Sequence, residues 1–319
     1  MELPPRLRQA VDEILRDTPI ADIRKAAELL SQRYRSEVRD GRLHVSDRLA
    51  VTAYLATRLP ATYATVRASL AAIAEIRPAW APRSLLDAGG GPGSVLWAAR
   101  DQWPSLEDAT MLETSEVMSR VGVALARESG ARTTWVAADI ARAVPALERA
   151  DLVTLSYVLG ELVPTAIDPL IERLWELSAD VLLVVEPGTP AGWQRILLVR
   201  DRLIALGALI IAPCPHAERC PLVAPDWCHF SRRVARSRRH RLAKDADIPW
   251  EDEKFIYLAV SRKPNDTAFA RVLARPRAAS GTVRLKLCSP TGQLEERLVT
   301  KRQGDDYKVA RRVDWGDRL

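Results

Sequence analysis

The sequence predicts an α/β protein with a parallel central sheet and helices on both of its faces. Three observations lead to this fold class. From residue 84 onward, short apolar segments alternate with helical ones. The residues before 78 show only the apolar spacing of helices, and those after 264 form short strands separated by turns. At 319 residues, 47% of them hydrophobic, the chain has ample material for a large core with attached parts.

Residues 1–80 are expected to form an N-terminal helical cap of four segments. Apolar side chains recur at helical spacing at Leu7, Val11 and Ile14, and the same spacing returns between residues 23 and 34. Two further helices are expected over 46–58 and 60–76, the second beginning with a proline that suits a first helical turn.

Residues 81–263 carry the alternating pattern and are expected to form the sheet domain. Strands are predicted at 84–88, 110–113, 134–138, 152–157, 181–186, 209–212 and 255–260, with intervening helices that include 94–102 and 117–128. Strands separated by helices pair in parallel. An irregular insertion, rich in cysteine and arginine, is expected at about 213–254, and a small basic β-rich extension with a turn at 289–292 is expected over 264–319.

The turn after the first predicted strand is rich in glycine and follows the pattern Asp-x-Gly-x-Gly-x-Gly. Its members are Asp87, Gly89, Gly91 and Gly93. Glycine lets the backbone turn sharply and approach a ligand, at the point where helix N–H groups face it. A nicotinamide or flavin fingerprint needs glycine at the first, third and sixth positions, and the sixth position here is Ser94. The spacing instead resembles the first motif of class I methyltransferases, which have a Rossmann-like sheet and bind S-adenosylmethionine.

That resemblance implies further cofactor residues at the ends of the next strands. Glu113 would accept hydrogen bonds from the ribose hydroxyls, and Asp139 would lie near the adenine amino group. Asp87 would face the methionine ammonium group, and Tyr157 ends the fourth predicted strand. The expected cofactor set is Asp87, Gly89, Gly91, Gly93, Glu113, Asp139 and Tyr157. The alternative is a structural glycine turn with ordinary surface acids.

No catalytic residue is assigned from the sequence. Amino-group methylases often carry an Asn/Asp-Pro-Pro-aromatic loop after the fourth strand, and residues 156–161 lack it. No cysteine lies near the fourth or fifth predicted strand to attack a cytosine ring. Tyr157 and Glu161 are candidates by their position, although strand-end packing for the first and a helix cap for the second are the favoured roles.

Four cysteines lie in the second half of the chain: Cys214, Cys220, Cys228 and Cys288. Clustered cysteines in a chain without a secretion signal favour a metal site over disulfides. Their spacing does not match the close pairs typical of zinc ribbons, although His216 and His229 would supply further zinc ligands. Four thiolates also suit a four-iron four-sulfur cluster, and the spacing leaves both metals open.

Motifs around these cysteines resemble one particular family. They are Cys214-Pro215-His216, Trp227-Cys228-His229-Phe230, the stretch 249–255 (PWEDEKF), and the segments 157–162 and 186–190. Together they resemble the mitochondrial small-ribosomal-subunit methyltransferase-like proteins and their bacterial relatives. The resemblance implies a four-iron four-sulfur cluster on the four cysteines and a role in small-subunit assembly, with zinc as the weaker alternative.

Charge is distributed unevenly along the chain. Residues 1–187 contain 21 Lys and Arg against 26 Asp and Glu, whereas residues 188–319 contain 26 against 15. A basic segment without acids follows Cys228, with Arg232, Arg233, Arg236, Arg238, Arg239, Arg241 and Lys244. These seven residues are the expected RNA-binding set, and the expected partners are the small ribosomal subunit and its rRNA. Trp227, Phe230 and Trp250 are possible base-stacking residues, with buried packing expected for the tryptophans.

Cys288 lies far along the chain from the other cysteines, so a shared metal would fasten the β-rich extension to the insertion. The cations of the extension would then extend the RNA-binding surface. They are Lys301, Arg302, Lys308, Arg311 and Arg312.

The sequence also gives expectations for location and assembly. Acids at Glu2, Asp12 and Asp17 interrupt any signal or transit peptide, and the longest apolar run, 203–214, is 12 residues. A membrane-spanning helix needs about 20 residues. A cytoplasmic protein without a membrane partner, monomeric off the ribosome, is therefore expected. Two functions are considered: an S-adenosylmethionine-dependent enzyme that modifies rRNA, and a non-catalytic RNA-binding assembly factor with a structural metal site.

Overall fold

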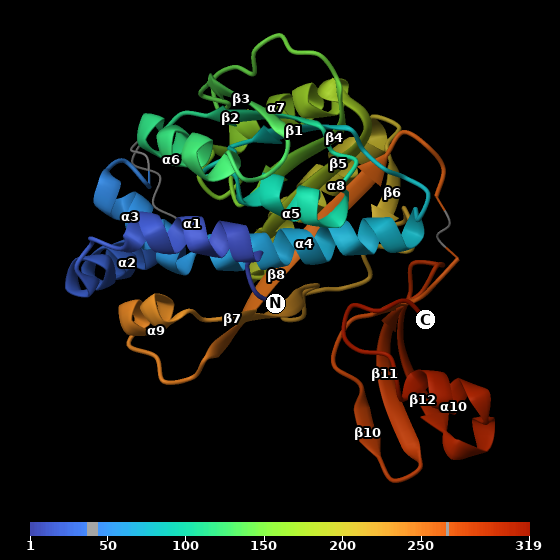
Figure 1. Ribbon diagram of the computed structural model, residues 1–319. Helices are drawn as coiled ribbons and strands as arrows, with labels where there is room; N and C mark the ends of the chain where they lie inside the picture. The colour runs from blue at the N-terminus through green and yellow to red at the C-terminus, as the bar shows by residue number, and fades with distance from the viewer. Residues whose placement is uncertain (37–43, 266–267) are drawn as a thin grey trace.

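The computed structural model describes residues 1–36, 44–265 and 268–319. Its main sheet contains β1 (Ser84–Ala88), β2 (Asp108–Glu113), β3 (Arg132–Ala137), β4 (Ala150–Ser156), β5 (Ser178–Pro187), β6 (Leu209–Ala212) and β8 (Trp250–Ser261). The strand order is β3-β2-β1-β4-β5-β8-β6 (Figure 1). Strands β1 to β5 pair in parallel, and β8 runs antiparallel to both of its neighbours. This is the topology of class I methyltransferases.

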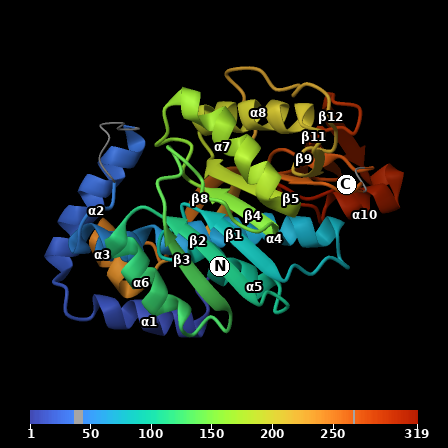
Figure 2. The same ribbon diagram turned by 90° about the horizontal axis from the view of Figure 1, so that it is seen from above.

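The predicted parallel sheet is thus confirmed for β1 to β5 and wrong for β8. Strand β6 ends and β8 begins at the same edge of the sheet, so the chain returns without a crossover helix. Residues 181–185 of β5 are completely buried, as expected for a strand in a sheet covered on both faces. Helices α5 (Ser94–Gln102) and α6 (Glu116–Ala126) lie on one face, and α7 (Pro164–Leu177) and α8 (Pro190–Ala205) lie on the other (Figure 2).

The four predicted N-terminal helices are present. They are α1 (Pro5–Leu15), α2 (Ile20–Arg35), α3 (Arg48–Thr57) and α4 (Leu59–Ile76). Helix α3 begins with an Asp47 cap that accepts a 2.8 Å hydrogen bond from the Ala50 N–H. Helix α4 packs against α5 and also contacts β5, β6, β8 and a further strand, β7 (Phe230–Ala235). It therefore joins the helical cap to the sheet.

The insertion between β6 and β8 is partly regular. Strand β7 (Phe230–Ala235) pairs antiparallel with β8, and α9 (Arg238–Lys244) lies between them and packs on α2 and α3. The expectation of an irregular segment is wrong for this part. The acids of β8 face the cations of β7, with Arg232 opposite Glu253 and Arg233 opposite Asp252. Opposite charges across an antiparallel pair stabilise it.

The C-terminal extension forms a second, antiparallel sheet with its own small core. Its elements are β9 (Arg271–Val272), β10 (Arg277–Ala279), β11 (Thr282–Cys288), β12 (Leu294–Thr300), the 3-10 helix η1 (Lys301–Gln303) and α10 (Asp305–Ala310). The predicted turn at 289–292 joins β11 to β12. The core includes Val283, Leu285 and Val299. An ion pair of 2.8 Å between Arg318 and Glu75 of α4 is one of the contacts that fasten this sheet to the body.

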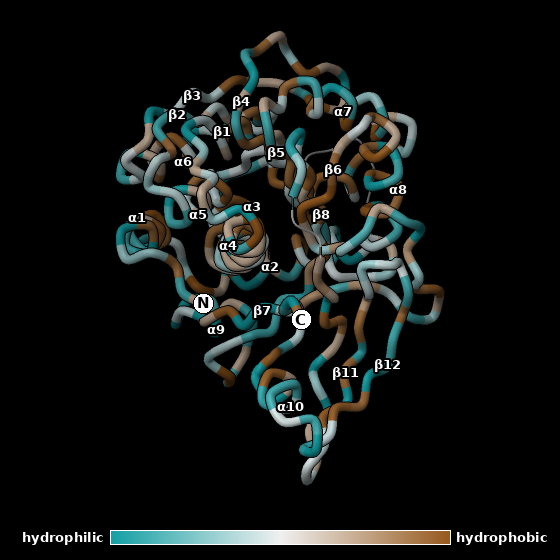
Figure 3. The backbone as a smooth tube through the Cα atoms, turned by 90° about the vertical axis from the view of Figure 1, so that its right-hand side faces the viewer, coloured by the Kyte–Doolittle hydropathy of each residue, from teal (hydrophilic) through white to brown (hydrophobic). Residues whose placement is uncertain are grey.

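The hairpin that carries α9 and the C-terminal sheet project from the same side of the molecule, below α4 (Figures 1 and 3). Across the described residues, no helix is both long and apolar enough to span a membrane.

Candidate cofactor and metal sites

The glycine-rich turn joins β1 to α5 as predicted. Gly89, Gly91 and Gly93 have φ angles of 74°, 52° and 84°, in the left-handed region that glycine adopts without strain. A Cβ atom on Gly89 would lie 2.6 Å from the Val158 side chain. The turn therefore requires glycine at all three positions for its conformation, and at Gly89 for its close packing as well.

Glu113 at the end of β2 holds this turn in place. Its two carboxylate oxygens accept hydrogen bonds from the Gly91 N–H at 2.9 Å and the Ser115 N–H at 2.7 Å. Burial raises the pKa of Glu113, and these backbone donors oppose that rise. The structure thus brings Glu113 next to the glycine turn, although the two are 20 or more residues apart in sequence.

Asp87 and Ser94 carry buried polar atoms without a hydrogen-bond partner in the described part of the chain. Asp87 is 1% exposed; its Oδ1 accepts a 2.6 Å hydrogen bond from Thr154, while its Oδ2 is unpaired. Burial raises the pKa of Asp87 to about 7. The Ser94 hydroxyl at the start of α5 is also buried and unpaired. Such groups are costly to bury alone, so they fit a polar ligand such as the methionine end of S-adenosylmethionine.

The other two expected cofactor residues end neighbouring strands. Tyr157 follows β4 with a φ of 62°, and its hydroxyl donates a 2.9 Å hydrogen bond to Thr65 of α4. Asp139 follows β3, is exposed, and forms a 3.2 Å ion pair with Arg142. Neither contacts the glycine turn through a hydrogen bond between described residues.

The helical cap supplies polar side chains beside Tyr157 that the sequence did not reveal. The Arg58 guanidinium lies 5.9 Å from the Tyr34 ring and 6.0 Å from the Tyr157 ring, and it pairs with Glu253 of β8 at 3.3 Å. These residues come from four separate segments, and no local pattern predicts their meeting. The Glu161 side chain is exposed. The arrangement does not single out a catalytic base.

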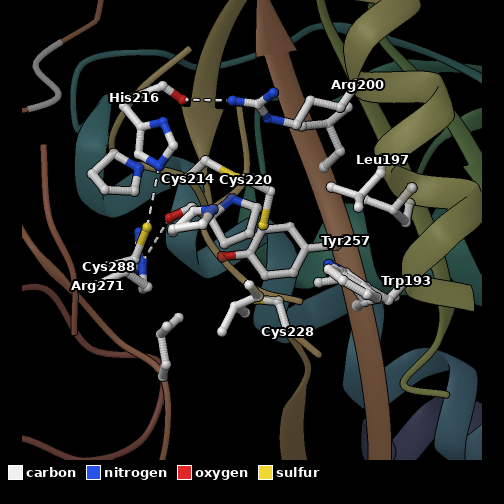
Figure 4. Close-up of a pocket in the computed structure, with 18 residues that line it drawn as sticks. Trp193, Leu197, Arg200, Cys214, His216, Cys220, Cys228, Tyr257, Arg271 and Cys288 are labelled. Atoms are coloured by element: carbon white, nitrogen blue, oxygen red, sulfur yellow. Dashed lines mark hydrogen bonds between the residues drawn. The ribbon is translucent and has the colours of Figure 1, made fainter. Parts of the chain in front are cut away.

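All four cysteines line one small cavity of about 30 Å³ (Figure 4). Cys214, Cys220 and Cys228 come from the loop between β6 and β7, and Cys288 ends β11 of the C-terminal sheet. All four are free thiols.

Burial raises the pKa of the Cys228 thiol, and the other three cysteines raise it further by charge repulsion. Burial likewise raises the pKa of Cys288 to about 12, with added repulsion from Cys214 and Cys220. The thiols therefore lie close enough to influence one another's ionisation. Without a bound cation, the protonated form is favoured for both residues.

Two histidines accompany the cysteines in sequence, and only one joins them in space. The Nε2 atom of buried His216 lies 3.2 Å from the Cys288 Sγ atom. His229 instead stacks on Trp227 with ring centroids 4.9 Å apart and is not among the residues that line the cavity. Within residues 1–36, 44–265 and 268–319, no group of three or more His, Cys, Asp or Glu side chains is arranged to hold a single metal ion. The metal site therefore remains a prediction.

Two buried arginines, Arg200 and Arg271, also line this cavity. Neither residue was predicted from the sequence. Arg200 lies on the apolar face of α8, at helical spacing from the buried Ile196 and Leu203. A charged residue on an otherwise apolar helix face is the feature of the sequence that could have identified Arg200 as a buried residue.

The predicted RNA-binding cations divide into two groups. Arg233 pairs with Asp252, Arg236 and Lys244 pair with Glu251, and Arg239 donates to the Arg16 carbonyl. The side chains of Arg232, Arg238 and Arg241 form no ion pair or hydrogen bond with another residue of the described ranges. Three consecutive acidic residues of β8, at 251–253, are the feature of the sequence that could have predicted ion pairs for some of these cations.

The aromatic residues near these cations differ in exposure. Trp250 is 44% exposed, contrary to the buried packing expected for it, and Arg233 lies 5.3 Å from its ring. Trp227 donates to the Gly188 carbonyl at 3.0 Å, and Phe230 is buried.

The strand order and the glycine turn define a class I methyltransferase-like protein. A family model described as "Mitochondrial small ribosomal subunit Rsm22" matches residues 48–319. The chain belongs to this family, which confirms the resemblance found in its motifs.

Two curated relatives and one solved structure illustrate the similarity. The human "Ribosome assembly protein METTL17, mitochondrial" is 30% identical over 293 residues, covering 83% of this chain and 61% of the relative. "Rsm22-cox11 tandem protein 2, mitochondrial" of Schizosaccharomyces pombe is 23% identical over 323 residues, covering 84% of this chain and 42% of the relative. The solved structure of the Synechocystis magnesium protoporphyrin IX methyltransferase with bound SAH is 16% identical, with a TM-score of 0.42. The match covers 73% of this chain and 94% of that chain.

The chain thus spans less than two thirds of the length of these two curated relatives. Their names also correct one expectation. All of the curated relatives named here are mitochondrial proteins, so the cytoplasmic location predicted from the N-terminal acids is wrong. Charge near the N-terminus was insufficient evidence on that point.

Proposed function

We propose that this protein binds S-adenosylmethionine and acts on the small ribosomal subunit, in rRNA modification or in subunit assembly. The observation that carries the proposal is the glycine turn, where Glu113 holds the loop and the Asp87 Oδ2 atom is buried without a partner. When bound, S-adenosylmethionine supplies an activated methyl group. Asp87 would face its ammonium group, and Glu113 would accept from its ribose hydroxyls. Asp139 and Tyr157 complete the proposed set.

The small-subunit part of the proposal rests on family membership and on the relatives' names. The human relative is named a ribosome assembly protein. Arg232, Arg238 and Arg241 would contact RNA phosphates, since these three lack acid partners among the described residues. Exposed Trp250 would stack on an unpaired base beside them. Arg233, Arg236, Arg239 and Lys244 would contribute less directly, because each already has a partner in the fold.

We further propose that Cys214, Cys220, Cys228 and Cys288 hold a four-iron four-sulfur cluster. Four thiols on one cavity satisfy its ligand requirement, and the buried arginines fit its negative charge. The family resemblance of the cysteine motifs favours this cluster, and a zinc ion, which also takes thiolate ligands, is the alternative. When bound, the cluster supplies a rigid link between the insertion and the C-terminal sheet.

Anaerobic purification tests the cluster. We expect about four irons and four sulfides per chain, with a brown colour. Stoichiometric zinc with neither iron nor sulfide would refute the cluster and favour the zinc alternative.

A non-catalytic assembly factor is the second candidate. It is favoured by residues 156–161, which lack the amino-methylating loop, and by the Arg58–Tyr34–Tyr157 contacts beside them. Mapping of rRNA crosslinked to the protein, together with modification analysis of that RNA in a deletion strain, separates the two. Loss of a methyl group at the crosslinked region supports the enzyme. Crosslinks with unchanged methylation support the assembly factor, and no crosslinks to small-subunit rRNA would overturn both.

A further inference from the structure

We propose that Arg200 and Arg271 are the positioning residues of the cysteine site, which provide the positive charge that a metal–thiolate cluster requires inside the protein. This inference rests on the cluster proposed above. It assigns the roles of two residues that no motif in the sequence identifies.

Both arginines are enclosed in the fold. Arg200 is 1% exposed and Arg271 is 2% exposed, and both guanidinium groups line the cysteine cavity (Figure 4). A guanidinium group keeps its proton in proteins. Burying such a charge is costly unless an opposite charge lies nearby. The two residues therefore require negative charge at this location.

The described contacts of the arginines leave this requirement unmet. Arg271 donates to the carbonyls of Pro213 at 2.9 Å and Gly316 at 2.6 Å, and no carboxylate of a described residue pairs with it. Arg200 donates to the carbonyls of His216 and Glu218, at 3.1 Å and 2.6 Å.

One carboxylate pairs with Arg200: that of Asp201, whose Oδ1 atom lies 3.2 Å from the Arg200 Nη1 atom. The Asp201 side chain is 74% exposed, so its charge is well solvated. The Nε atom of Arg200 and the Nη2 atom of Arg271 have no hydrogen-bond partner among the described residues.

The cysteines are the available source of the missing charge. The residues that line the cavity include four cysteines and no Asp or Glu. A thiol that coordinates a metal is deprotonated. Four thiolates around an oxidised four-iron four-sulfur core leave a formal charge of minus two, and the two guanidinium groups balance it. The unpaired N–H groups would donate to sulfur, as hydrogen bonds to cluster sulfurs commonly do.

Each arginine also fixes one ligand-bearing segment. Arg271 faces Cys288 across the β9–β11 pair and bonds the carbonyl that precedes Cys214. Arg200 bonds two carbonyls between Cys214 and Cys220. Together they hold the loop and the C-terminal sheet at a common cavity.

The test compares Arg200→Gln, Arg271→Gln and the charge-conserving Arg200→Lys and Arg271→Lys in the full chain. Arg202→Gln is the matched control, because Arg202 lies on the same helix and pairs with Glu172 away from the cavity. Three quantities are measured: far-ultraviolet circular dichroism, the rate of iron loss to a chelator, and the reduction potential of the cluster.

We expect each Gln variant to lose iron about tenfold faster than wild type, since a charge-assisted hydrogen bond is lost. Its reduction potential should shift to more negative values, because a missing cation disfavours the extra electron. Each Lys variant should keep a potential near that of wild type even if its iron loss is faster, and Arg202→Gln should match wild type.

Folded Gln variants with unchanged iron loss and potential would overturn the inference while leaving the cluster in place. Gln and Lys variants with the same potential shift would also overturn it, because the charge would then be irrelevant. If the Gln variants do not fold, the Lys variants and their potentials decide the outcome. Wild-type protein without iron and sulfide would instead refute the proposed cluster itself.

Discussion

The glycine turn and the cysteine cavity are built in opposite ways. The turn arises from consecutive residues, and its conformation is fixed by backbone bonds to β2, including those from the Gly89 and Gly90 N–H groups to the Leu112 carbonyl at 2.9 Å. The cavity brings together a loop, helix α8 and a strand of another sheet. The first site is fixed by hydrogen bonds within the protein, whereas the second buries charge that the described residues leave unbalanced. Ligand loss should therefore affect the two regions unequally.

The largest expected effect is on the C-terminal sheet. Replacing Cys288 by Ser removes one cluster ligand and the link between β11 and the loop at 213–229. Because metal-binding free energy is also folding free energy, we expect faster amide hydrogen exchange across residues 268–319. Exchange in β1 and α5 should change little. Unchanged protection of the C-terminal sheet would show that its own core suffices.

How far the sequence predicts each region follows from the same contrast. The glycine turn, β1 and the β11–β12 turn depend on local signals, and all were predicted. The direction of β8 and the pairing of β7 depend on contacts between distant segments. The cysteine cavity could be predicted only in part. The four cysteines were recognised from the sequence, whereas Arg271 reaches the cavity through the pairing of β9 with β11, which no local pattern predicts. The seven cations were visible too, but their partners on β8 were recognised only from the register.

At the glycine turn, Glu113→Ala should weaken S-adenosylmethionine binding by roughly 1.5–3 kcal/mol, the usual contribution of hydrogen bonds to a charged group. Isothermal titration calorimetry measures the change. Glu116→Ala is the control, because Glu116 is exposed on α6 and pairs only with Arg120 among the described residues. Equal affinities for wild type and Glu113→Ala would exclude the proposed ribose contact.

On the basic hairpin, replacing both Arg238 and Arg241 by Gln should reduce the salt dependence of RNA binding. The slope of log affinity against log salt should fall by about 1.4 for single-stranded RNA, with a roughly tenfold loss of affinity. Arg233→Gln should change the slope less, since Arg233 already pairs with Asp252 at 2.9 Å. A filter-binding series at several salt concentrations gives both slopes, and identical slopes for all variants would refute this RNA contact.

The smallest expected effect concerns Asp87. Its pKa is raised by burial from 3.8 to about 7, so the folded state resists ionisation that the unfolded chain undergoes near pH 4. This residue therefore reduces stability progressively as the pH rises from about 4 to about 7.

Asp87→Asn should raise the free energy of unfolding of the cofactor-free protein by on the order of 1 kcal/mol at neutral pH, and by less near pH 4. Urea denaturation at both pH values measures the difference. The same variant should bind S-adenosylmethionine more weakly. A variant less stable than wild type at neutral pH would contradict the assigned burial cost.

The most direct test of the two-region account measures both ligand affinities in a single variant. Wild type and Cys288→Ser are compared, at matched salt, for binding to S-adenosylmethionine and to the small ribosomal subunit. We predict that cofactor affinity is largely retained and that subunit affinity falls, because only the second depends on the cluster-linked surface. Loss of cofactor binding together with unchanged subunit binding, in a folded and cluster-free variant, would contradict the account.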